Sequence, residues 1–279
     1  YALLSGRISP ARMSQAYSIH IFAGFSGTAA APATMIILAE SLGWRGAFLV
    51  SAALGVAVAA IVLLFGEVMA GRDPTRIKEK ETGEKGTDSR ILLTRPILLS
   101  MCFFILLAMT GALPIYGIVA MEALWGTSLS VATTAITAYL AMAAFAVLVG
   151  GYISARTDRH DLIAIIGLSI HALALVPIAF FDLGAAALIG LMGLSGFFNG
   201  VLQPSRDMIV RAVTQPGAFG RVFGFVSTGF SIGGVIAPPI FGYMMDHGEP
   251  RLVILGAAFC ALISIPTVMI TVSQGAKRV

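Results

Sequence analysis

The chain has few charged residues and few cysteines, and both shortages narrow its class. Charged residues make up 11% and hydrophobic residues 57% of the sequence, whereas soluble domains carry about a quarter charged residues. This composition excludes a soluble protein, because water would face most of the apolar surface. The two cysteines, Cys102 and Cys260, lie in separate apolar runs. We therefore expect neither a disulfide framework nor a cysteine metal site.

Catalytic motifs are also lacking. The sequence has no nucleophile elbow, no zinc-type histidine spacing, no phosphate-binding loop and no paired carboxylates inside an apolar run. Asp158 and Asp161 flank His160, but their short loop is better explained as a connection between helices than as a metal site. We expect no enzyme activity, no cofactor and no metal. Without a basic patch on a folded face, we also expect no nucleic-acid partner.

The sequence does contain eight long apolar runs. About 20 apolar residues cross the ~30 Å hydrocarbon core of a bilayer as a helix. The runs are 14–38, 44–65, 97–120, 130–152, 162–181, 184–204, 221–244 and 252–272. If these helices alternate in direction, every Lys and Arg except Arg45 and Arg251 falls on one side, which the positive-inside rule makes cytoplasmic. The sequence thus predicts an all-α, multi-pass protein of the cytoplasmic (inner) membrane, embedded in the lipid bilayer.

An internal repeat relates two of these runs. The stretch 10–45 aligns with 216–251 without a gap, and the matched pairs include Pro10 and Pro216, Tyr17 and Phe223, Gly27 and Gly233, Pro32 and Pro238, and Arg45 and Arg251. The identities are few, but a helix proline, a glycine five residues before it and an arginine opening the next run recur in register. Such a long period is typical of two-lobed transporters built from duplicated helix bundles.

A charged stretch divides the chain. Residues 66–95 alternate acidic and basic side chains and include glycine and proline, as a solvated linker does. We therefore expect residues 1–65 to hold the last two helices of one lobe, 66–95 to link the lobes, and 96–279 to form a complete six-helix lobe. Equal lobes would require about four further helices before residue 1, so we expect this chain to be the larger part of a longer protein.

Polar side chains on the apolar helices are the candidates for a substrate cavity. Ser195, Asn199, Gln203 and Arg206 recur at helical spacing and lie on one stripe. Polar groups in hydrocarbon face either a cavity or a partner helix, and both explanations remain open for this stripe. Arg206 also suits the negative end of its helix. Further cavity candidates are His20, Thr133, Thr137 and Tyr116.

Glycine and proline within the runs predict bending and close packing. Proline removes a helical hydrogen bond and small residues let backbones approach each other. The positions at which we expect the helices to bend are Gly27, Pro32, Pro114, Gly233, Pro238 and Gly242.

Three motifs resemble the major facilitator superfamily. Gly151, Arg156 and Arg159 match the short-loop pattern Gly-x-x-x-Asp-Arg-x-Gly-Arg-Arg, although Ala155 and Asp158 replace its Asp and Gly. The stretch from Gly233 through Pro238 to Gly242 is similar to the pattern Gly-x-x-x-Gly-Pro-x-x-Gly-Gly. A Gly-Trp-Arg sequence at residues 43–45 opens a helix, as is common in the family. Because Ala155 stands where the family has Asp, the resemblance does not extend to a charge lock built on that Asp.

The resemblance implies a major-facilitator-like bundle of twelve helices in two lobes, of which about eight are present. It also implies alternating access, with Gly151, Arg156 and Arg159 in a gating loop. We accordingly expect a secondary transporter, a symporter or antiporter, that moves a small organic solute and is coupled to an ion, the proton. Few intramembrane charges suggest an uncharged or lipophilic solute, unless charged partners lie in further helices. The alternative is a transporter-like sensor or assembly protein.

Overall fold

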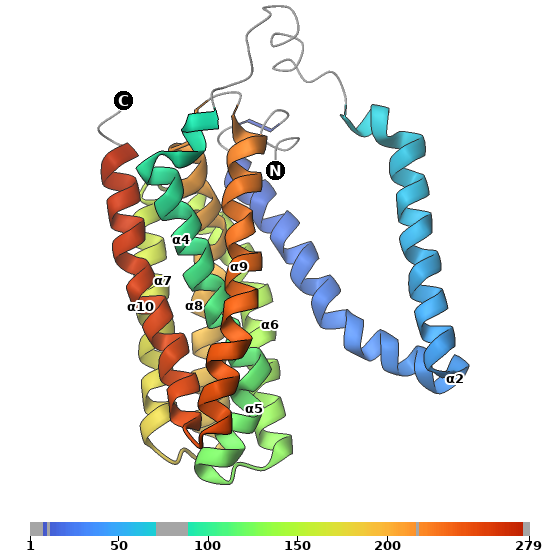
Figure 1. Cartoon of the computed structure of the whole chain (residues 1–279), viewed down its shortest axis with the longest axis vertical. Helices are drawn as coiled ribbons and strands as arrows, with labels where there is room; N and C mark the ends of the chain where they lie inside the picture. The colour runs from blue at the N-terminus through green and yellow to red at the C-terminus, as the bar shows by residue number, and fades with distance from the viewer. Residues whose placement is uncertain (1–7, 10–11, 71–88, 216–217, 276–279) are drawn as a thin grey trace, which may run out of the picture.

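The computed structural model describes residues 8–9, 12–70, 89–215 and 218–275, and no strand occurs within these ranges. The elements are α2 (Met13–Ala70), η2 (Ser89–Leu93), α4 (Arg95–Thr110), α5 (Ala112–Trp125), α6 (Leu129–Ser154), α7 (His160–Phe180), α8 (Ala185–Ala212), α9 (Phe219–Asp246) and α10 (Pro250–Gly275). Helices α4 to α10 form one upright bundle, and α2 stands beside it (Figure 1).

Seven helical segments among the described residues are long and apolar enough to cross a membrane. They correspond to the predicted runs from 44–65 onward, which confirms the all-α membrane fold. The remaining run, 14–38, is also helical as the first part of α2, but it is not one of the seven. The predicted linker falls largely on residues 71–88, which lie outside the described residues. Helix α2 itself continues to Ala70, beyond the predicted boundary at residue 65.

Helices α6 and α8 make the closest packing in the bundle. A Cβ atom added at Gly196 or Gly200 would overlap the backbone of Tyr139 or Ala143, and one at Gly150 would overlap the backbone of Val201. Glycine is therefore required at these positions, because the two helices pack backbone against backbone. This contact fixes α8, which carries the predicted polar stripe, against α6.

Helices α4 and α9 approach each other in the same way. A Cβ at Gly233 would lie 2.5 Å from the Ile105 carbonyl oxygen, and one at Gly229 would lie 2.8 Å from that of Met101. Gly233 thus serves close packing. Helix α9 runs unbroken through Pro238 and Gly242, and the Tyr116 hydroxyl donates to the Pro238 carbonyl oxygen at 3.3 Å.

The predicted run 97–120 is broken into α4 and α5. Gly111 ends α4 in a tight turn whose N–H donates to the Ala108 carbonyl oxygen at 3.0 Å. Pro114 lies four residues after Thr110 and has no N–H to donate to its carbonyl, so the helical ladder is interrupted at this point. The sequence predicts a bend at Pro114, and the break between α4 and α5 lies at Gly111, three residues earlier.

Helix α2 consists of two arms that meet at Gly43. Gly43 has φ 70° and ψ 165°, a conformation that favours glycine, and it is the residue within α2 whose backbone is not helical. The first arm is 13–42 and the second is 44–70. Pro32 lies inside helical backbone, and its side chain is outside the described part. The second arm stands away from the bundle, and no residue of its most apolar window is buried.

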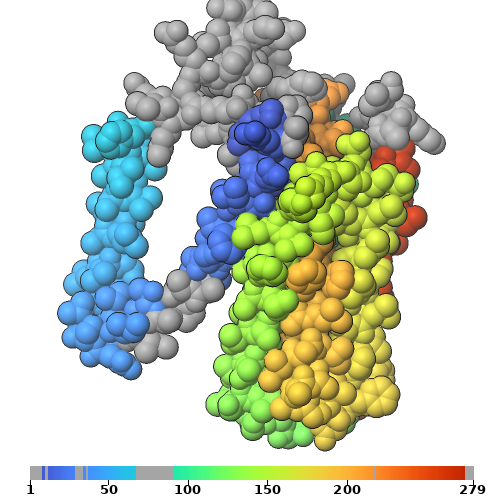
Figure 2. Space-filling model, turned by 180° about the vertical axis from the view of Figure 1, so that it is seen from behind, coloured from blue at the N-terminus to red at the C-terminus, as the bar shows by residue number. Residues whose placement is uncertain are grey.

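The first arm packs against the bundle at its start, where Ser14 and Ser18 lie against Gly151. We call this end of the bundle the basic end; it carries the α6–α7 loop with Arg156 and Arg159, and the start of α9 with Arg221. From there the arm diverges toward the opposite end, as Figures 1 and 2 show from two sides. The arm packs on α6 and α8. The result is a space that is closed at the basic end and widens away from it.

Candidate functional site

A cleft of about 900 Å³ lies between the first arm of α2 and the bundle. We call it the outer cleft; it is lined by Ile21, Gly24, Phe25, Thr28, Thr137, Leu140, Ala141 and Phe230. A second pocket of about 330 Å³, the deep pocket, shares Ile21, Phe25, Leu140 and Phe230 with it. The two cavities are therefore adjacent, with the same apolar side chains between them.

The deep pocket reaches the predicted polar stripe. Its other lining residues are Leu107, Ala108, Thr110, Gly111, Pro114, Tyr139, Ala143, Asn199, Gln203 and Arg206. Three of the four stripe residues thus face one cavity, at the break between α4 and α5 and on the glycine-rich side of α8. The apolar outer cleft leads to a polar floor built by α8.

Arg206 forms the centre of this floor. Its Nε donates to the Asp207 carboxylate at 2.7 Å, and its Nη1 donates to the Gln203 side-chain oxygen. The guanidinium also lies over the rings of Phe104 and Phe230, 4.8 and 5.0 Å from their centroids. A buried charge is tolerated only when it is paired and hydrogen-bonded. The ion pair and the two rings meet that requirement.

Ser195 does not line either cavity. Its hydroxyl and its carbonyl oxygen lie 2.8 and 3.1 Å from Nδ1 of His171 on α7, and all these groups are buried. The Tyr139 ring lies 6.2 Å from the His171 ring. The stripe is therefore divided: its first residue joins α7 to α8, while the next three face the deep pocket. Helix-to-helix bonding accounts for Ser195.

The other predicted cavity residues are spread out. Thr137 lines the outer cleft, and its hydroxyl donates to the Thr133 carbonyl oxygen at 2.8 Å. Thr133 and His20 are exposed, and neither lines the two cavities. The Tyr116 hydroxyl donates to the Pro238 carbonyl oxygen on α9. Of this group, only Thr137 lies at the candidate site.

The start of α2 is fastened to the basic end of the bundle. The Ser14 hydroxyl donates to the Gly151 carbonyl oxygen at 3.3 Å, and a Cβ at Gly151 would overlap the Ser18 side chain. Tyr17 packs edge-on against Phe223, with ring centroids 6.2 Å apart. We call these five residues the basic-end contact. Tyr17 and Phe223 are equivalent positions of the internal repeat, so the two repeat units meet each other here.

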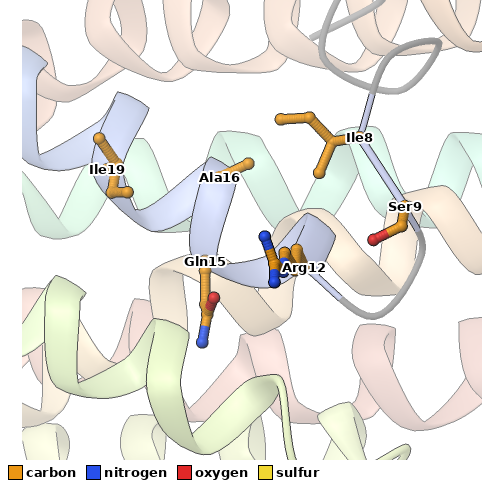
Figure 3. A pocket seen from close by; sticks show the side chains of 6 residues that line it. All are labelled: Ile8, Ser9, Arg12, Gln15, Ala16 and Ile19. Atoms are coloured by element: carbon orange, nitrogen blue, oxygen red, sulfur yellow. The ribbon is translucent and has the colours of Figure 1, made fainter.

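A surface hollow of about 390 Å³ lies beside this contact. Figure 3 shows its lining residues, Ile8, Ser9, Arg12, Gln15, Ala16 and Ile19. All six come from one short segment at the start of α2. The described lining residues thus belong to a single segment, whereas the deep pocket is lined by several helices, which makes the hollow a weaker candidate.

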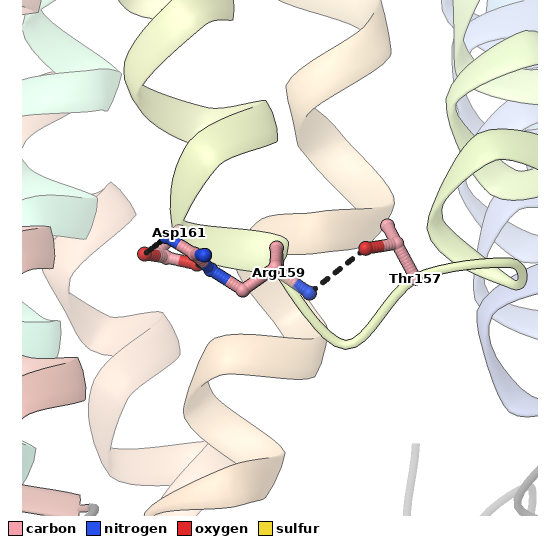
Figure 4. A network of polar contacts seen from close by, with 3 residues as sticks. All are labelled: Thr157, Arg159 and Asp161. Carbon is pink, nitrogen blue, oxygen red and sulfur yellow. Dashed lines mark hydrogen bonds and ion pairs between the residues drawn. The ribbon is translucent and has the colours of Figure 1, made fainter.

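The arginines of the α6–α7 loop are held locally. Figure 4 shows Arg159 with its Nε 3.3 Å from the Asp161 carboxylate and its backbone N–H donating to the Thr157 hydroxyl at 3.1 Å. The Arg156 guanidinium lies 3.6 Å from the centroid of the Tyr152 ring. Both arginines are exposed. Of the three predicted gating residues, Gly151 is the one in the basic-end contact.

Several site residues were missed by reasoning from the sequence. Asp207, Phe104 and Phe230 surround Arg206, and Phe25 lines both cavities. A signal for Asp207 existed, because a carboxylate next to an arginine near the membrane is rarely unpaired. Nothing in the sequence singles out the phenylalanines among the 17 present. Within the described ranges, no group of three or more His, Cys, Asp or Glu is arranged to hold a metal ion.

Comparison with known families agrees with the fold. The family model described as Major Facilitator Superfamily matches residues 1–123 and, in a second match, residues 98–278. A comparison with curated proteins returns no match. The two family matches together cover nearly the whole chain, including both arms of α2 and the α4–α10 bundle. Members of this family are typically transporters rather than enzymes. The chain belongs to the major facilitator superfamily and is a multi-pass membrane protein of the transporter class.

Proposed function

We propose that this protein is a secondary active transporter that moves a small organic solute by alternating access. The observation that carries the proposal is the shape of the space beside α2. It is closed at the basic end by the basic-end contact, and it holds an apolar cleft that leads to a buried polar floor. A solute pathway closed at one end and open toward the other is what alternating access requires of each end state.

In this proposal, residues 1–65 belong to one lobe and residues 96–279 to the other, as expected from the sequence. The basic-end contact is then the gate between lobes on the cytoplasmic side. Its helix surfaces carry small residues, since Ser14 and Ser18 lie against Gly151, and the Tyr17 ring packs edge-on against Phe223. Small residues packed in this way allow the two helix surfaces to separate by rigid rocking of the lobes.

We further propose that the coupling ion is a proton and that Asp207 carries it. Among the described residues Asp207 is the buried carboxylate, and its partner Arg206 lines the deep pocket. Tyr17 of α2 interacts electrostatically with Asp207 and Arg211. Protonation of Asp207 would remove its negative charge and weaken its hold on Arg206. The carboxylate would thereby connect the pocket floor to the gate.

The test is flux through the full-length protein in liposomes. We expect uptake of a solute from a broad panel of uncharged and lipophilic organic compounds when a pH gradient is imposed, and loss of gradient-driven accumulation in Asp207→Asn. A sodium gradient alone should give none. Thr133→Ala, on an exposed surface outside both cavities, is the control and should transport normally.

If no compound moves under any gradient, although the protein is correctly inserted, the transport proposal fails. A sensor or assembly role then becomes the better account. If accumulation follows pH in Asp207→Asn as in the unchanged protein, transport stands but the role of Asp207 is wrong.

A further inference from the structure

Arg206 fixes the direction of a chain of hydrogen bonds along the pocket floor. A guanidinium only donates, so the atom of Gln203 that faces it is the side-chain oxygen. The Gln203 nitrogen then points the other way and donates to the Asn199 side-chain oxygen at 3.2 Å. With its oxygen committed, Asn199 turns its NH₂ group away from Gln203. The orientation of both amides follows from the arginine.

The free end of this chain is a donor that lies at the deep pocket. Asn199 lines the pocket, and within the described residues its NH₂ group has no hydrogen-bond acceptor. Polarisation along the chain from the guanidinium strengthens that donor. Nearby, the Thr110 hydroxyl already donates to the Leu107 carbonyl oxygen at 2.7 Å. The Asn199 NH₂ group is therefore available to donate a hydrogen bond to an acceptor oxygen of a ligand.

The floor carries no net charge with which to bind an ion. Among the residues that the structure describes, Arg206 is the charged side chain that lines the deep pocket, and none of those lining the outer cleft is charged. While Asp207 is ionised, its 2.7 Å contact with Arg206 balances the charge of the guanidinium. A buried anion would meet Asp207 next to Arg206, and a buried cation would meet Arg206. Either would lose its hydration without gaining an unpaired countercharge.

The residues shared by the outer cleft and the deep pocket favour a ligand with a flat apolar part. Phe25 and Phe230 belong to both cavities, and the remaining shared residues, Ile21 and Leu140, are aliphatic. Aromatic rings stack on such surfaces or meet them edge-on. A ligand that spans the two cavities thus has its apolar part between these residues and its polar atom at Asn199.

From this geometry we infer the substrate class of the proposed transporter, an inference that rests on the proposed function. The solute is an uncharged aromatic or otherwise apolar molecule that carries a carbonyl-type acceptor oxygen. Asn199 binds that oxygen through its NH₂ group and is the residue that determines specificity for it. Charged analogues with the same ring system are excluded.

Four matched probes test this class: indole-3-acetamide, indole-3-acetate, tryptamine and 3-methylindole. All four contain the indole ring. The acetamide is neutral and has a carbonyl oxygen, the acetate is an anion, tryptamine is a cation, and 3-methylindole is neutral without an acceptor oxygen. Binding to the full-length protein in lipid nanodiscs is measured at pH 7 by equilibrium dialysis, with empty nanodiscs subtracted. We expect the acetamide to bind about ten-fold more tightly than each of the other three, since one good hydrogen bond is worth about that factor.

Two variants locate the effect. Asn199→Asp replaces the donor by a carboxylate acceptor of the same shape, so acetamide affinity should fall about ten-fold and tryptamine should become the preferred probe. Thr133→Ala lies outside both cavities and should leave all four affinities unchanged. A thermal unfolding curve for each variant shows whether it is folded.

The inference is overturned if the acetamide binds no better than 3-methylindole, if a charged probe binds best, if none binds, or if the folded Asn199→Asp variant keeps the original order. Binding in the expected order without any flux in liposomes would instead leave the ligand class standing and refute transport. Flux of a charged solute that is the same in the Asn199→Asp variant as in the unchanged protein would support transport and refute the ligand class.

Discussion

Arg206 and Asp207 are neighbours in sequence and partners in space, and both are buried. Side chains one position apart on a helix point in different directions, so this pair is not a regular helical contact. The Arg206 guanidinium lies over the rings of Phe104 and Phe230, and in that position its Nε donates to the Asp207 carboxylate. The ion pair offsets part of the cost of burying the two charges.

Removing one partner should therefore be costly. Arg206→Met keeps much of the side-chain volume but takes the ion-pair partner from Asp207, and we expect it to lower the free energy of unfolding by about 3 kcal/mol. Adding Asp207→Asn to that variant should recover part of the loss, because the carboxylate that lost Arg206 is then replaced by a neutral amide. Thermal unfolding in detergent measures both. A double variant that is less stable than the single one contradicts the pairing.

The divided stripe gives a second prediction at the residue scale. Ser195→Ala should lower stability by about 1 kcal/mol, since it removes the 2.8 Å contact with His171, and it should leave flux unchanged. Asn199→Ala should reduce flux at least about ten-fold, because the pocket loses its donor. Flux and thermal unfolding are compared for the two variants in parallel. Equal loss of flux in both would mean that the stripe acts as one unit.

At the scale of elements, glycine determines how close the helices come. Gly200→Ala on α8 should destabilise the bundle by about 2 kcal/mol, because the added Cβ has no room against the α6 backbone at Ala143. Gly190→Ala on the same helix is the matched control. A Cβ there meets nothing within 4 Å, so the variant should be neutral or slightly more stable through helix propensity. Equal effects would show that α6 and α8 are not in backbone contact.

The sequence predicted the elements well but not all their interruptions. A long apolar run predicts a membrane-spanning helix, because in lipid its backbone N–H and C=O groups must bond to one another. The Trp-Arg pair after Gly43 also indicated where α2 divides into two arms. The break at Gly111 was expected near Pro114, since proline frees a carbonyl one turn earlier. For Gly233 the sequence indicated bending, whereas the structure shows close packing on α4. Both uses favour a small residue, so the residue type alone does not distinguish them.

The candidate site was predicted only in part, for a physical reason. Helical spacing shows that Asn199, Gln203 and Arg206 share a face of α8 with Ser195, but not which neighbouring helix each of them meets. That depends on α7, whose His171 takes Ser195, and on α4 and α9, whose phenylalanines enclose Arg206. Such contacts arise between segments far apart in the chain, and spacing within one helix carries no information about them.

At the scale of the whole molecule, the repeat gives the basic-end contact its meaning. Tyr17 and Phe223 occupy equivalent positions in the two repeat units, and they touch. Equivalent residues that meet lie on the axis that relates the two units. In the proposed transporter that axis runs along the pathway, so the aromatic pair closes the pathway at its centre. The outer cleft then lies on the open side of this closure.

Opening this contact should change the state of the molecule. Gly151→Leu places a large side chain where even a Cβ overlaps Ser18, so the start of α2 should be forced away from α6. We expect the variant to favour the state open at the basic end and to lose coupled transport. Gly190→Leu, on an open surface, should do neither. Limited proteolysis at the basic end, compared between the two variants, gives an independent measure.

The most direct test of the gate is cysteine accessibility, in a background with Cys102 and Cys260 replaced by alanine. Ser18→Cys is buried in the basic-end contact, Thr28→Cys lines the outer cleft, and Arg159→Cys is the exposed reference on the basic side. A membrane-impermeant maleimide is applied to each face of sealed vesicles. If the basic-end contact is the closed gate, maleimide labels residue 28 from one face of the membrane and residue 159 from the opposite face. Residue 18 should stay protected unless Gly151→Leu is added. Labelling of residue 18 from the basic side as fast as residue 159, with the gate intact, would contradict it.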